Sequence, residues 1–126
     1  MSDDLILVGS ALHGLLAAGT LTWYRDVAPG TATMPFGVWS FQSGSDEYDF
    51  GGRFTIYDYN VRVVTDDDWP TRAEQLAADA GTLIQNTPMA ITGYEHLECR
   101  RSSPVHYRDP DGFWNVGGIY RVWVHD

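Results

Sequence analysis

The segment from Arg53 to Val64 alternates apolar and polar side chains with a period of two, as a β-strand with one buried face does. Its apolar side consists of Tyr57, Tyr59, Val61 and Val63. Its polar side carries Asp58, Asn60 and Arg62. The chain therefore needs a layer that covers one face of a sheet, while the other face meets water or a partner.

Two segments have the spacing of amphipathic helices that could form this layer. In the first, apolar residues recur at helical intervals from Leu5 to Leu16, with Ser2 as a capping residue before them and Gly19 as a stop signal after them. In the second, from Asp68 to Asn86, alanine and leucine follow the i, i+3, i+4, i+7 rule. We predict that both helices pack on the sheet.

Three consecutive aspartates, from Asp66 to Asp68, precede the second helix and could mark a metal site or a helix start. A calcium loop needs alternating acids, a glycine and a later glutamate, which this run lacks. Asp68 can cap the helix, Pro70 suits its first turn, and the segment from Thr71 to Glu74 offers an alternative capping box. Acidic groups also favour the positive end of the helix dipole. We therefore interpret the run as structural.

The remaining strands are predicted from turn signals. Short strands are expected at Leu21–Arg25 and Phe36–Gln42, and the Gly- and Ser-rich segment Ser43–Gly52 is expected to be a loop. An Asp-Gly turn between Arg108 and Phe113 predicts a closing hairpin.

Pairing Arg108 with Phe113 sets the register of this hairpin, so that facing residues have numbers that sum to 221. One face then carries the pairs Leu97 with Val124, Cys99 with Val122 and Arg101 with Tyr120. The other face carries His96 with His125, Glu98 with Trp123 and Arg100 with Arg121.

Two arginines that face each other destabilise a sheet unless acids lie between them. Asp58 of the long strand, or an acid from another subunit, is expected to compensate Arg100 and Arg121. Gly117 and Gly118 are candidates for a bulge that would shift the register.

These elements predict an α+β fold. We expect a two-layer sandwich in which a mostly antiparallel sheet of about five strands is packed by two helices. The length of 126 residues suits one domain, spanning residues 1–126.

The charge balance argues against several classes of partner. The formal net charge is −9, from 17 acidic and 8 basic residues, which disfavours a module that grips nucleic-acid phosphates or anionic membranes. The apolar N-terminal stretch begins with two aspartates and is shorter than the roughly 20 apolar residues of a membrane span. Cys99 has no second cysteine with which to form an intrachain disulfide.

We predict no catalytic residue, no metal site and no cofactor. His96 and His125 would supply two ligands where zinc needs three or four. Cys99 falls on the predicted core face, where a thiol is usually inert. Two other functions stay open: a monomeric small-molecule module, and a metal-dependent hydrolase. The hydrolase would use Asp66, Asp67, His96 and His106.

The aromatic content favours self-association. Five tryptophans, seven tyrosines and five phenylalanines exceed what two thin layers need, and interfaces use aromatic residues and arginines as anchors. The candidate interface residues are Asp46, Glu47, Tyr48, Asp49, Phe50, Arg100, Arg101, Phe113, Trp114 and Arg121.

Two passages resemble the tail terminator, or tail completion, proteins of long-tailed bacteriophages with non-contractile tails. The first is YDYNVRVVTDDDWPTRAEQLAADAGTLI, in which a Tyr/Val strand runs into an acidic cap and a helix. The second is RDPDGFWNVGGIYRVWVHD, with an Asp-Gly turn before the final strand. The resemblance covers nearly the whole chain.

The resemblance implies a structural virion protein made in the host cytoplasm and located in the tail or neck. It implies a hexameric ring that caps the tail tube, stops its polymerisation and joins the tail to a head-completion or neck protein. The candidate interface residues would then contact a neighbouring subunit or the tail-tube protein, and DNA would only pass through the lumen. A head-tail connector or stopper protein is the alternative within this class.

Overall fold

The computed structural model describes residues 2–49, 52–85 and 95–125. The elements are α1 (Ser2–Ala17), β1 (Trp23–Arg25), β2 (Phe36–Asp49), β3 (Gly52–Thr65), α2 (Thr71–Gln85), β4 (Glu95–Arg108) and β5 (Trp114–His125). The five strands form one sheet in the order β1-β2-β3-β5-β4. Every pairing is antiparallel except the one between β1 and β2, which is parallel. The predicted α+β sandwich is confirmed.

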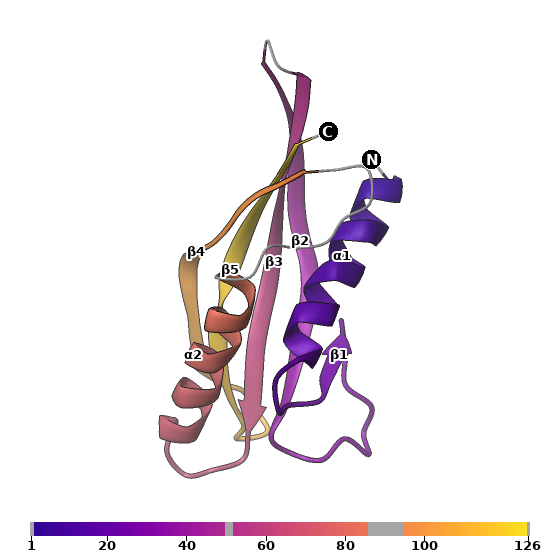
Figure 1. Ribbon diagram of the computed structural model, residues 1–126. Helices are drawn as coiled ribbons and strands as arrows, with labels where there is room; N and C mark the ends of the chain where they lie inside the picture. The colour runs from indigo at the N-terminus through magenta and orange to yellow at the C-terminus, as the bar shows by residue number, and fades with distance from the viewer. Residues whose placement is uncertain (1, 50–51, 86–94, 126) are drawn as a thin grey trace.

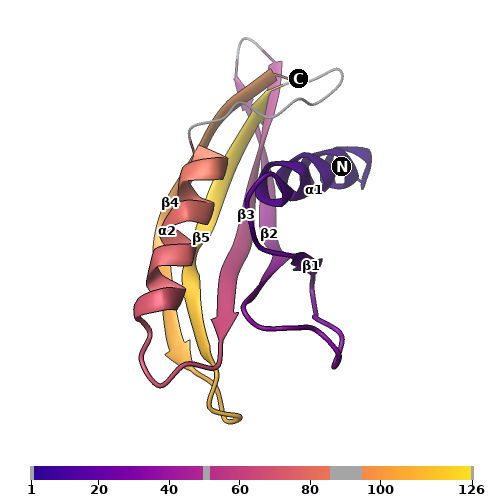
Figure 2. The same cartoon turned by 60° about the horizontal axis from the view of Figure 1, so that its bottom comes forward.

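Both helices lie on the same face of the sheet, side by side along its length (Figures 1 and 2). The predicted apolar side of β3 forms the centre of the core beneath them. The fully buried residues of this core include Val8, Leu12 and Leu16 of α1, Ile84 of α2, and Tyr57, Tyr59 and Val63 of β3. Burial of each aliphatic side chain of this kind is worth about 1.5–3 kcal/mol. The apolar side of β3 therefore determines on which face of the sheet both helices pack.

The α1 helix is tied to the sheet by one polar contact as well. The Trp39 indole nitrogen of β2 donates a hydrogen bond to Nδ1 of His13, with a nitrogen–nitrogen distance of 3.0 Å. The helix ends as predicted, since the backbone N–H of Gly19 bonds the Leu16 carbonyl at 3.1 Å.

The prediction of a loop at Ser43–Gly52 is wrong. Residues up to Asp49 continue β2, and β3 begins at Gly52, so the two strands form one long hairpin. The pairing runs from Ser43 opposite Asp58 to Asp49 opposite Gly52, after a register shift between Phe41 and Ser43. Glycine and serine favour turns locally, but pairing along the whole of β3 overrides that preference.

The predicted register of the last hairpin is correct in its middle and wrong at both ends. Glu98 faces Trp123, Cys99 faces Val122, Arg100 faces Arg121 and Arg101 faces Tyr120, as expected. Beyond these pairs β4 gains one residue on each side, between Arg101 and Ser103 and between His96 and Glu98. The irregularities therefore lie in β4, whereas the glycines at 117 and 118 had predicted them in β5.

These shifts change three predicted pairs. Arg108 faces Trp114 and not Phe113. His96, and not Leu97, faces Val124. His125 faces Glu95, so the two histidines are not opposite each other.

Two element starts also differ from prediction. The first strand is limited to Trp23–Arg25, because only these residues pair with β2. The second helix starts at Thr71, after Pro70, whose carbonyl accepts the first helical hydrogen bond from Glu74 at 2.8 Å. Asp67 forms an ion pair with Arg72 of the first turn at 2.8 Å, whereas Asp68, the predicted cap, lies before Pro70 and outside the helix start.

The turn between β4 and β5 is held by Asp109. Its Oδ1 accepts hydrogen bonds from the backbone N–H groups of Phe113 and Asp111, both at 3.0 Å. These bonds, led by the one from Phe113, lower the pKa of the Asp109 carboxyl group. Gly112 has a φ of 88°, which explains why glycine follows the second aspartate.

Candidate functional site

Among the residues that the structure describes, the face of the sheet that lies away from the helices is covered at one end. There, Phe36, Val38 and Val64 pack beneath partly buried residues of the segment between β1 and β2, including Ala28, Ala32 and Met34. We call the rest of this side the open face. Its described residues include Ser40, Ser43, Ser45, Ile56, Asp58, Asn60, Glu98, Arg100, Ser103, Ile119, Arg121 and Trp123.

An ion pair lies at the centre of the open face. Nε of Arg121 donates to Oδ1 of Asp58 at 2.9 Å, and Nη2 donates to Oδ2 at 3.3 Å. Ser43 adds a third hydrogen bond to the same carboxylate at 3.2 Å. The bonds from Arg121 to Asp58 raise the pKa of the guanidinium. The Asp58 side chain is only 16% exposed, although no described helix or loop lies over it.

This pair confirms the compensation predicted for the two facing arginines. Arg100 lies directly opposite Arg121, and each has its own acid: Arg121 has Asp58, and Arg100 forms an ion pair with Glu98. These four charges are therefore neutralised within the sheet itself.

We expect Asp58→Asn to lower the melting temperature by a few degrees. The substitution keeps the shape of the side chain but leaves the positive charges of Arg100 and Arg121 facing each other with one acid fewer. Thermal unfolding followed by circular dichroism measures the shift. Asp79→Asn, at an exposed position of α2, is the matched control and should melt like the wild type. Equal melting temperatures for the two variants would contradict the stabilising role of Asp58.

The predicted interface residues fall in four separate places. Arg100 and Arg121 lie together on the open face, whereas Arg101 points to the helix side. Phe113 and Trp114 lie at the β4–β5 turn. Phe113 is partly buried against the cluster of Phe36, Val38 and Val64. The Trp114 indole nitrogen donates a hydrogen bond to the Asp68 carbonyl at 3.4 Å. Asp46, Glu47, Tyr48 and Asp49 belong to β2, but their side chains lie outside what the structure describes, as does Phe50.

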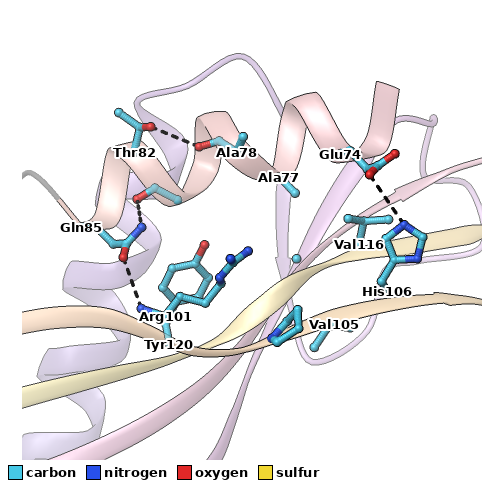
Figure 3. A pocket seen from close by; sticks show the side chains of 13 residues that line it. Glu74, Ala77, Ala78, Thr82, Gln85, Arg101, Val105, His106, Val116 and Tyr120 are labelled. Carbon is cyan, nitrogen blue, oxygen red and sulfur yellow. Dashed lines mark hydrogen bonds and ion pairs between the residues drawn. The ribbon is translucent and has the colours of Figure 1, made fainter. Parts of the chain in front are cut away.

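A groove of about 600 Å³ runs between α2 and the strands β4 and β5 (Figure 3). Its polar walls contain Glu74, Gln85, Arg101 and His106. Gln85 accepts a hydrogen bond from the backbone N–H of Arg101 at 3.2 Å, and Glu74 lies 3.9 Å from Nε2 of His106. Sequence reasoning missed this groove because its residues come from three elements. The glycine at position 81, within a helix, was the one local signal.

The hydrolase residues are not brought together in the described part of the chain. Asp67 contacts Arg72, and His106 contacts Glu74 on the groove wall. The side chain of His96 lies outside the described residues. No group of three or more His, Cys, Asp or Glu side chains among the described residues is arranged to hold a metal ion.

Several large apolar side chains are exposed in places that sequence reasoning did not single out. Trp69, in the turn before α2, is 77% exposed, and Val27 is also strongly exposed. Both belong to loops at the same end of the molecule as the β4–β5 turn (Figures 1 and 2). On α1, Ile6 and Leu7 face solvent. Neither described helix has both the length and the apolar sequence needed to cross a membrane.

Comparison with known proteins gives a family and a fold. The family model for tail completion protein gp17 matches residues 7–125. A solved structure described as the virion of a native gene transfer agent particle contains a chain that matches with a TM-score of 0.78 and 16% sequence identity. That match covers 95% of this chain and 98% of the other, and at this identity it shows a shared fold. Comparison with curated proteins finds no match.

Proposed function

Because the chain belongs to the tail completion protein gp17 family, we propose that it is a tail terminator. It is a structural protein of the virion tail, and in the proposed role six copies form a ring on the head-proximal end of the tail tube. The ring stops addition of tube subunits and presents its far side to a head-completion or neck protein. The family match over residues 7–125 is the observation that carries this proposal.

Two physical features support a ring. The helices and the open face lie on opposite sides of the sheet, so each subunit offers two unlike surfaces, as a head-to-tail contact that closes by rotation requires. Six copies would carry a formal charge of −54 (6 × −9). Such an acidic ring repels the DNA backbone, so that a genome can pass without binding.

We further propose roles for the residues predicted from sequence. Arg100 and Arg121 contribute to the contact between subunits, because they lie on the open face. The outer part of the β2–β3 hairpin, with Asp46, Glu47 and Asp49 in its sequence, contacts the tail tube.

The proposal is tested by polymerising the tail-tube protein of the same virus with and without this protein. Without it, tubes should grow to uncontrolled lengths. With it, negative-stain images should show shorter tubes with a sixfold ring on one end, because a bound ring removes the surface to which the next subunits add. The protein should bind tube ends and not the portal side, which separates a terminator from a stopper. Unchanged tube lengths and bare ends would contradict the proposal.

A further inference from the structure

The outer face of α1 lacks the charged residues that a helix in contact with water normally has. No Asp, Glu, Lys or Arg occurs from Leu5 to Ala17. On the inner side, Val8, Leu12 and Leu16 are completely buried. On the outer side, Ile6 is 59% exposed and Leu7 is 37% exposed. A helix without charged residues on its outer side is normally covered there, which makes this outer face a candidate contact surface.

The rest of the outer face is made of small residues. Ser10, Gly14 and Ala17 are all exposed, and a side chain added at Gly14 would meet nothing within 4 Å. Small residues allow the backbone of another element to approach closely. We define the outer face of α1 as Ile6, Leu7, Ser10, Gly14 and Ala17.

The open face of the sheet has the complementary properties. The four charges at its centre are already paired, Asp58 with Arg121 and Glu98 with Arg100, and the neighbouring Arg62 donates hydrogen bonds to the amide oxygens of Asn60 and Asn115. Ile56, Ile119 and Trp123 are partly exposed between and beside these pairs.

A depression lies on the open face beside the Asp58–Arg121 ion pair. It has a volume of about 280 Å³. It is lined by Ser43, Gly44, Ser45, Ile56, Asp58 and Arg121. Ile56 supplies its apolar wall, and Ser43, Ser45 and the Asp58–Arg121 ion pair supply polar ones. Ile56, with the partly exposed Ile119 and Trp123 beside it, offers apolar contacts to large aliphatic side chains such as Ile6 and Leu7 of a neighbouring helix.

We propose that the outer face of α1 in one subunit packs on the open face of the next copy of the chain. This inference rests on the proposed ring. The two surfaces lie on opposite sides of one sheet, so a contact between two identical surfaces would leave the other surface uncovered. A head-to-tail contact covers both in every subunit. The open face then becomes a buried sheet face, with helices on both sides of it.

The substitution Gly14→Glu separates this contact from folding. Because the position is exposed and unobstructed, and glutamate is a better helix former than glycine, the isolated subunit should melt at the same temperature or higher. Rings and capped tubes should be lost, because a charged side chain would be placed in an uncharged contact. Gln75→Glu, which adds the same charge at an exposed position of α2 outside both surfaces, is the matched control and should still form rings. Rings formed by Gly14→Glu as readily as by the wild type would overturn the proposal.

A photo-crosslinking amino acid at position 14 identifies the surface that contacts the outer face of α1. In a mixture of isotopically labelled and unlabelled subunits assembled on tubes, crosslinks between copies should join α1 to β3 or β5. Crosslinks from α1 to α1, or to the tube subunit, in particles that do cap tubes would overturn this contact while the terminator function stands. If the wild type does not cap tubes and the variant with the crosslinker at position 14 forms no crosslinks between copies, both this contact and the terminator function are overturned.

Discussion

Replacing Gly117 with alanine is expected to prevent stable folding. A Cβ atom at this position would lie 1.9 Å from the Val61 carbonyl oxygen and 2.7 Å from the Cα atom of Arg62. Both obstacles are backbone atoms of β3, the middle strand of the sheet, and neither can rotate away as a side chain would. Relief requires β5 to move away from β3, where Gly117 pairs with Arg62.

The expected cost is large relative to the stability of a small domain. Overpacking that flexible neighbours can absorb costs about 1–3 kcal/mol, and a clash with backbone should exceed this. Total stabilities are about 5–15 kcal/mol, so the variant should be unfolded, or should melt far below the wild type, in circular dichroism. Gly30→Ala is the matched control, since an added Cβ at Gly30 meets nothing within 4 Å. A Gly117→Ala variant that melts within a few degrees of its control would contradict the close approach of β3 and β5 at this position.

Much of the fold could be predicted because its strongest signals are local. The alternation in β3 identifies the buried face, and the Asp-Gly turn before β5 indicates a hairpin whose register is correct at Cys99 and Arg100. That register in turn places Arg100 opposite Arg121 and indicates that an acid such as Asp58 is needed. Charge balance, read from the sequence alone, thus locates the centre of the open face.

The errors come from features that no local pattern records. One extra residue in β4 between Arg101 and Ser103 changes each pairing beyond it, and nothing in the sequence marks that place. The segment Ser43–Asp49 has the composition of a turn, but it pairs because β3 continues opposite it. The apolar sequence of α1 predicted a buried helix. It could not show that one side of the helix, with Ile6 and Leu7, is exposed, because that depends on which side packs on the sheet.

Cys99 should react with thiol reagents about a thousandfold more slowly in the folded protein than in the unfolded one. The side chain is buried in the core beneath the helices, together with Tyr120, Val122 and Ile84. Burial disfavours the thiolate and raises the pKa of Cys99 from 9.0 to about 12, and the nearby Glu98 charge adds to this effect. The thiolate is the reactive form, and at pH 8 its fraction falls by about three orders of magnitude relative to a thiol with an ordinary pKa.

The measurement compares labelling rates at pH 8 with and without guanidinium chloride, using the single cysteine of the chain as the only target. Folded and unfolded rates within tenfold of each other would contradict burial of the thiol.

The raised pKa of Cys99 also makes the free energy of unfolding depend on pH. Because the folded state keeps a proton that the unfolded state releases, the contribution of Cys99 is complete below its unfolded pKa of 9.0 and is lost as the pH rises toward about 12. The serine hydroxyl of Cys99→Ser does not titrate in this range, so this variant should lose less stability than the wild type between pH 9 and pH 12. At neutral pH the variant should be less stable than the wild type, because its hydroxyl group is buried.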